Sequence, residues 1–91
     1  MLYVVAYDIA DDDRRQRVAR YLEGWGRRVE KSVFECDVSR GQVREIAAHL
    51  RSLLVLREDR CHIYRLCAEC TRHRVVIGED LEPSWAGVVV V

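Results

Sequence analysis

The chain has 91 residues and a hydrophobic fraction of 49%, which suits one small domain with a packed core and excludes a disordered chain. Its 15 basic and 15 acidic residues give a net charge of zero, which argues against strong and indiscriminate binding of nucleic acid. No apolar stretch is long enough to span a membrane and the first residues do not resemble a signal peptide, so we expect a cytoplasmic protein with reduced cysteines.

The first element is a buried strand, predicted over residues 2–6 by its β-branched and aromatic residues. Asp8 stands at the tip of this strand. Burying an unpaired charge is costly, so a carboxylate beside a core strand has a cation, a metal ion or hydrogen-bond donors to meet. Two interpretations of Asp8 stay open from the residues alone: a functional ligand, or a turn cap or partner of a nearby arginine.

Two helices and a strand region follow. The first helix is predicted to open at the aspartates 11–13 and to end at Gly26, with an apolar face made by Val18, Tyr21, Leu22 and Trp25. Residues 28–38 are rich in strand formers and make one bent strand or two short strands with a tight turn. A second helix starts after Ser39 or Gly41, and its apolar stripe comprises Val43, Ile46, Ala47, Leu50 and Leu54.

The last third of the chain reads as strands. We predict them over 61–66 and 75–77, then a polar connection over 79–83 and a terminal strand at the valines 88–91, which would form a sticky edge if unpaired. These elements favour an α+β fold, the ferredoxin-like βαββαβ sandwich with an extra C-terminal strand. Because the first strand is apolar on both sides, its second face needs a cover, and a second copy in a symmetric homodimer is the simplest one.

The position of Asp8 and the many arginines are compatible with a protein that cleaves or binds phosphodiesters. Magnesium takes oxygen ligands and keeps several waters, so one or two carboxylates suffice. A two-fold dimer would supply a second Asp8, and a divalent ion between the two could activate water and neutralise charge on a phosphodiester. Fourteen of the fifteen basic residues are arginine, whose forks bind phosphates, although genome composition accounts for such a bias as well.

The four cysteines match only part of a zinc-site pattern, which Cys36 and Cys61 or a partner chain would have to complete. Cys67 and Cys70 form one C-x-x-C motif, followed by His73, whereas a structural zinc ion needs four ligands. Cys36 and Cys61 are better read as small strand residues. A thiol redox role is disfavoured, because we predict no thioredoxin-like helix after the motif.

Three segments together resemble one known family. They are Tyr7-Asp8-Ile9 with the acidic turn after it, Arg14-Arg15 on the first helix, and the run RVEKSVFE over residues 28–35. In this combination they closely resemble the CRISPR-associated endonuclease Cas-two family, the small dimeric subunit of the spacer-acquisition machinery. The resemblance covers nearly the whole chain.

The resemblance implies a ferredoxin-like homodimer in which the two first-strand aspartates face each other. It makes Asp8 the catalytic acid and the ligand of Mg²⁺ or Mn²⁺, and it places Tyr7 and Phe34 at the active cleft. The residues expected to contact nucleic acid are Arg14, Arg15, Arg17, Arg28, Lys31 and Ser32. Residues 1–78 would form the nuclease and adaptation domain, and residues 79–91 a connection and a C-terminal strand that packs on the partner protomer.

The implied activity is magnesium-dependent cleavage of single-stranded RNA or double-stranded DNA, together with an integrase partner in spacer acquisition. Two other functions stay open. One is a scaffold that bridges DNA without catalysis, in which Asp8 is structural. The other is a toxin-type ribonuclease of the same fold.

Overall fold

A computed structural model describes residues 1–78, 89 and 90. The elements in chain order are β1 (Leu2–Asp8), α1 (Asp12–Glu23), β2 (Arg27–Glu30), β3 (Val33–Asp37), α2 (Arg40–Leu53), β4 (Arg60–Leu66), α3 (Ala68–Arg72), β5 (Val75–Val76) and β6 (Val89–Val90). Within this part of the chain, no helix has the length and apolar character needed to cross a bilayer.

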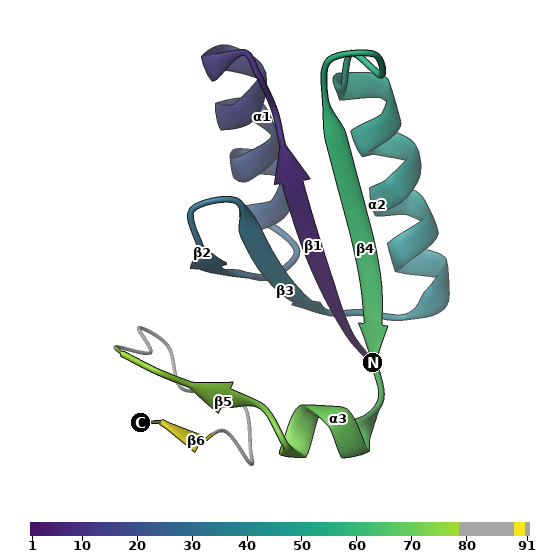
Figure 1. Ribbon diagram of the computed structural model, residues 1–91. Coiled ribbons are helices and arrows are strands. Elements are labelled where there is room, and N and C mark those ends of the chain that lie inside the picture. The colour runs from purple at the N-terminus through teal and green to yellow at the C-terminus, as the bar shows by residue number, and fades with distance from the viewer. Residues whose placement is uncertain (79–88, 91) are drawn as a thin grey trace.

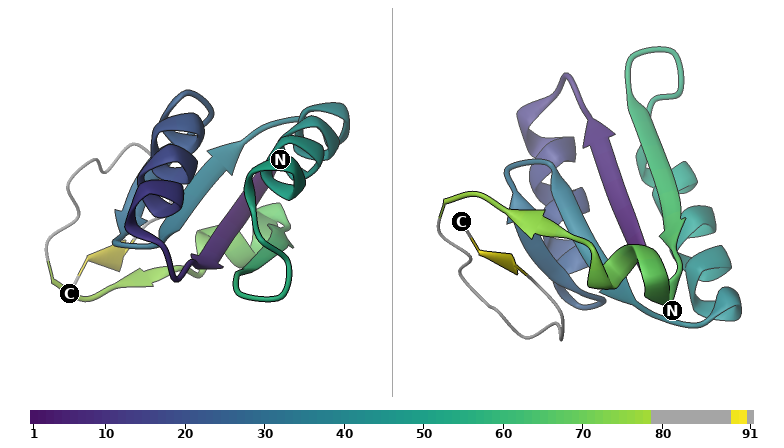
Figure 2. Two further views of the ribbon diagram at one scale, coloured as in Figure 1. Left: turned by 90° about the horizontal axis from the view of Figure 1, so that it is seen from above. Right: turned by 60° about the horizontal axis from the view of Figure 1, so that its bottom comes forward.

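The first four strands form one antiparallel sheet in the order β2-β3-β1-β4. Helices α1 and α2 cover one face of this sheet, and α3 and β5 lie on the side of the other face (Figures 1 and 2). This arrangement confirms the predicted ferredoxin-like α+β sandwich. The region 28–38 resolves into two strands joined by a turn at Lys31 and Ser32.

Strand β1 divides its side chains between the two faces of the sheet. Tyr3, Val5 and Tyr7 are buried against the helices, while Val4 and Ala6 on the opposite face are half-buried. This alternation follows from the two-residue period of a strand. The core that receives the inward side chains also includes Val18, Leu22, Phe34, Ile46 and Leu50.

Side-chain caps set the starts of both long helices. Asp11 caps α1 by accepting a hydrogen bond from the Arg14 amide at 2.9 Å, and Ser39 caps α2 through a capping box with Gln42. Both starts agree with the sequence predictions.

Helix α1 ends earlier than predicted, at Glu23 rather than at Gly26. Gly26 instead lies against β3, where a Cβ atom would come 2.2 Å from the Glu35 carbonyl oxygen and 2.8 Å from the Cys36 sulfur. The absence of a side chain therefore lets the chain cross closely over β3 before it enters β2.

The uncovered face of the sheet is occupied at one end by the segment after β4. Arg74 pairs there with the buried carboxylate of Glu35, which also lies 3.5 Å from the Arg27 guanidinium. Figure 2 shows this segment passing in front of the sheet. The sequence analysis did not predict α3, a five-residue helix that begins at Ala68, inside the C-x-x-C motif.

Strand β6 pairs in parallel with β5, Val89 opposite Val75 and Val90 opposite Val76. The polar connection over 79–83 and the other terminal valines lie outside the described residues. The division at residue 78 and the packing of the C-terminal strand on a partner protomer therefore stay predictions.

Candidate functional site

Asp8 ends β1 on the face of the sheet that α1 and α2 do not cover. Its side chain is exposed, and its partner in the register with β4 is Arg60. Among the described residues, no hydrogen bond or ion pair involves its carboxylate. The interpretation of Asp8 as a turn cap or as the partner of an arginine therefore has no support in this part of the chain.

The turn between β2 and β3 is held beside the end of β1. The Tyr7 amide donates to the Ser32 carbonyl oxygen at 3.0 Å, and the Tyr7 hydroxyl lies 3.5 Å from the Lys31 carbonyl oxygen. The Tyr7 and Phe34 rings stack with centroids 6.3 Å apart. Both rings are buried on the helix side, so they support the strand under Asp8, and their expected place in an open cleft stays a prediction.

A buried ion pair fixes the loop that follows Asp8. The carboxylate of Asp59, whose side chain is 0% exposed, accepts hydrogen bonds from Arg14 Nε at 2.9 Å and Nη2 at 3.1 Å. It also accepts from the backbone amides of Ala10 at 3.2 Å and Val55 at 2.9 Å. The hydrogen bond from Arg14 lowers the pKa of Asp59 from 3.8 to about 2.

This ion pair gives Arg14 an internal partner. Its expected role was contact with nucleic acid, which stays a prediction, but its guanidinium is engaged with Asp59 and only partly exposed. The neighbouring Arg15 is also tied down, since Nη1 donates to the Ile9 carbonyl oxygen at 3.0 Å and Nη2 pairs with Asp12. Arg17 is exposed on α1.

A basic groove of about 370 Å³ runs between α1 and β2. It brings together three residues that the sequence analysis expected to contact nucleic acid: Arg15, Arg28 and Lys31. The groove also contains Arg20, which the sequence analysis did not single out. Gln16, Ala19, Arg20 and Glu23 share one helix face by their spacing, and that periodicity was the available signal.

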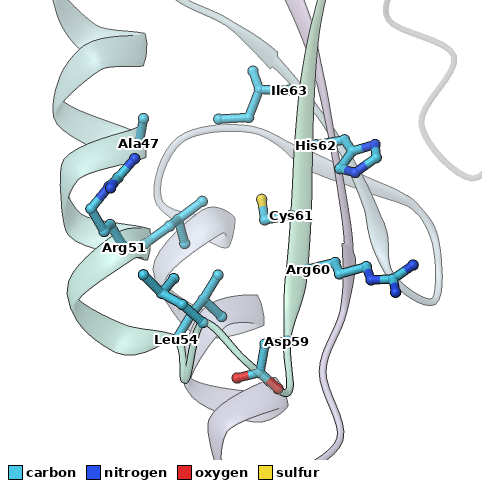
Figure 3. Close-up of a pocket in the computed structure, with 10 residues that line it drawn as sticks. Ala47, Arg51, Leu54, Asp59, Arg60, Cys61, His62 and Ile63 are labelled. Atoms are coloured by element: carbon cyan, nitrogen blue, oxygen red, sulfur yellow. The ribbon is translucent and has the colours of Figure 1, made fainter.

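A second cavity of about 360 Å³ lies between α2 and β4. Figure 3 shows Cys61 and Ile63 on the side of β4 that faces α2, whereas Arg60 and His62 point the other way. Residues directly opposite in an antiparallel pair share a face, so Asp8 lies on the side of Arg60. The sheet therefore separates this cavity from Asp8.

The described part of one chain does not form a closed metal site. The described residues contain no cluster of three or more His, Cys, Asp or Glu side chains that could hold an ion. An exposed carboxylate without an internal partner still fits Mg²⁺, which keeps most of its waters and needs one or two carboxylates. Asp8 is therefore suited to be half of a site shared with a second copy.

The sequence and the fold both match proteins of one family. A family model described as CRISPR associated protein Cas2 matches residues 1–74. The chain is similar to "CRISPR-associated endoribonuclease Cas2 1" of Chloroflexus aurantiacus, with 44% identity over 85 residues that cover 92% of this chain and 91% of that protein. It is also similar to "CRISPR-associated endoribonuclease Cas2 3" of Synechocystis, with 40% identity over 90 residues, which are 99% of this chain and 98% of that protein.

Among solved structures, the chain is similar to Streptococcus pyogenes Cas2 with a TM-score of 0.69 and 29% identity, covering 74% of this chain and 87% of that one. The matched residues 1–74 include β1, the β2–β3 turn and β4, the elements that place Asp8. On these grounds the chain belongs to the CRISPR-associated protein Cas2 family, as the resemblance of its motifs predicted.

Proposed function

We propose that this chain is a metal-dependent endonuclease of CRISPR adaptation, which hydrolyses phosphodiester bonds in single-stranded RNA or double-stranded DNA. The proposal rests on the exposure of the Asp8 carboxylate, at the end of a core strand, and on its lack of a partner among the described residues. The names of the similar Chloroflexus and Synechocystis proteins, both called endoribonucleases, support a nuclease.

A homodimer would complete the site. The uncovered face carries the half-buried Val4 and Ala6 together with Tyr64, which is 55% exposed. A second copy would bury these apolar side chains, because a two-fold axis brings the same patch of each protomer together. The same axis would bring a second Asp8 to the site.

The chain's own residues would hold and orient the nucleic acid. The two Asp8 carboxylates would hold Mg²⁺ or Mn²⁺, which supplies Lewis-acid charge stabilisation and an activated water. Arg28, Arg20 and Lys31 would bind phosphates in the α1–β2 groove, where arginine forks fit phosphate oxygens. Buried Tyr7 keeps the β2–β3 turn beside the strand that carries Asp8.

The proposal also includes where the protein acts and with which partner. We place the dimer in the cytoplasm, where it acts with an integrase subunit in spacer acquisition. A non-catalytic scaffold that bridges DNA is the second candidate function, and the basic α1–β2 groove, which could bind phosphates without catalysis, supports it. A dimer that held its two Asp8 residues apart would bind duplex without cleaving it.

The test uses the purified full-length chain. Sedimentation should give a dimer, and labelled single-stranded RNA or duplex DNA should be cleaved with Mg²⁺ or Mn²⁺ but not after chelation with EDTA. Cleavage that persists unchanged in EDTA would contradict the metal dependence. A protein that stays dimeric and binds duplex, yet cleaves neither substrate with any divalent ion, would establish the scaffold instead.

The basic groove gives a second expectation. Arg20→Ala or Lys31→Ala should each weaken binding and reduce the slope of log affinity against log salt by about 0.7 to 0.9, as expected for one lost phosphate contact. Filter binding over a range of salt concentrations measures this slope. Arg44→Ala, an exposed arginine of α2 outside the groove, is the matched control and should leave the slope unchanged. Equal slopes for all variants would remove the groove from the binding surface.

A further inference from the structure

Two exposed cysteines lie side by side where β4 leads into α3. Cys67 caps α3 and Cys70 lies in its first turn, with their sulfur atoms 3.4 Å apart. The Cys70 amide also donates to the Cys67 sulfur at 3.4 Å. A disulfide needs the two sulfur atoms about 2 Å apart, so a small rotation of the side chains brings this pair to bonding distance.

The other two cysteines of the chain are less suited to disulfide formation, because they are less accessible. Cys36 is fully buried in β3 and Cys61 is half-buried in β4. Burial, with a smaller contribution from Glu35, raises the pKa of Cys36 to about 11, and burial also raises the pKa of Cys61. Because the thiolate is the reactive form, both thiols are poor nucleophiles.

The electrostatics of the exposed pair favour Cys67 as the attacking sulfur. The hydrogen bond from the Cys70 amide, and then the contact between the two sulfur atoms, lower the pKa of Cys67. The contact between the two sulfur atoms and the nearby charge of Cys67 raise the pKa of Cys70. One sulfur is thus favoured as a thiolate while its neighbour holds a proton.

We propose that Cys67 and Cys70 form a reversible intrachain disulfide, with a small-molecule disulfide of the oxidised glutathione class as the oxidant. The Cys67 thiolate attacks one sulfur of that disulfide and releases one glutathione thiolate. The Cys70 thiolate then attacks the Cys67 sulfur of the mixed disulfide and releases the second glutathione. Two protein thiols are oxidised, one glutathione disulfide is reduced to two thiols, and the two cysteine protons end on those thiols.

Because Cys67 and Cys70 lie at the start of α3, a disulfide between them would restrain this helix. None of the five residues of α3 is buried, so this helix has little packing to hold it. It links β4 to Arg74, which reaches across the sheet to Glu35. A bond between its cap and its first turn restrains α3, and the redox state thereby controls the mobility of the connection to β5.

Thiol counting tests the bond itself. After incubation of the full-length chain with oxidised glutathione, titration under denaturing conditions should find two of the four thiols, and peptide mapping should join Cys67 to Cys70. Cys70→Ser should instead stop at a glutathione adduct on Cys67. Cys61→Ser is the matched control and should lose the same pair of thiols as the natural chain. Four remaining thiols, or bridges only between chains, would overturn the proposal.

Limited proteolysis tests the consequence. Arg72 is exposed in the last turn of α3, so trypsin should cut there about threefold more slowly in the oxidised chain, because cleavage follows local opening. The double variant Cys67→Ser/Cys70→Ser should be cut at one rate in both conditions. Equal rates for the oxidised and reduced natural chain would show that the bond does not restrain the connection.

Discussion

The substitution Asp8→Asn should abolish cleavage while the fold persists. The amide keeps the size of the side chain but removes the negative charge that holds a divalent ion, so the cleavage rate should fall at least about 100-fold, or about 2.7 kcal/mol of transition-state stabilisation. The carboxylate is exposed and has no partner among the described residues. Its loss should therefore shift the melting temperature by no more than about 2 °C.

The control for this substitution is Asp13→Asn. Asp13 is also exposed and lies in the first turn of α1, so its variant loses the same charge from a different element. Its cleavage rate should stay within about twofold of the natural chain, because an exposed charge that does not bind the ion is largely screened. Single-turnover assays of the three proteins at saturating Mg²⁺ measure the difference. Equal activity of Asp8→Asn and the natural chain would remove Asp8 from catalysis.

The substitution Asp59→Ala should have the largest effect on stability. It would leave the Arg14 guanidinium and two backbone amides, those of Ala10 and Val55, without their shared acceptor. Removing one partner of a buried ion pair leaves an uncompensated charge, so the melting temperature should fall by roughly 10 °C or more. Differential scanning calorimetry at pH 7 measures this change.

Glu58→Gln is the matched control for Asp59→Ala. Glu58 contacts the same Arg14 at 3.6 Å, but its side chain is 52% exposed. An exposed ion pair contributes little, so this variant should change the melting temperature by about 2 °C at most. Similar losses in the two variants would mean that the buried hydrogen bonds of Asp59 do not hold this loop.

The contribution of Asp59 should also depend on pH. Its pKa is about 2 in the folded protein and 3.8 in the absence of these contacts, so the folded state binds the proton less readily than the unfolded state. The stabilisation is complete above pH 3.8 and is lost as the pH falls towards 2. The gap in melting temperature between the natural chain and Asp59→Ala should therefore narrow over this interval. A constant gap down to pH 2 would contradict the assignment.

The strongly patterned elements could be predicted from the sequence. The alternation in β1 and the helical spacing in α1 and α2 come from residues that face one common core, so local pattern and tertiary structure agree. Helix α3 was missed because a five-residue helix with no buried residue has no apolar periodicity to detect. Gly26 looked like a helix terminator, and only its close approach to β3 shows why a side chain is excluded there.

Only those site residues that have a local signal in the sequence could be predicted. Asp8 could be found because it interrupts an apolar strand. Asp59 could not, since its partner Arg14 is 45 residues away and its surroundings give no local signal of burial. The same pairing changes how the basic cluster on α1 is understood, because sequence alone does not distinguish an arginine that faces solvent from one that holds a buried carboxylate.

The alternation along β1 makes correct folding a condition for displaying the candidate site. Tyr7 is buried in the core and Asp8, the next residue, is exposed on the opposite face. A deletion or insertion of one residue within β1 would move the side chains that follow it to the other face, so Tyr7 would turn towards solvent and Asp8 towards the helices. A chain with that error would lose its core and its carboxylate together. In this chain, substitutions on the uncovered face leave the core in place, whereas a change of length within β1 would disturb the core and the display of Asp8 at once.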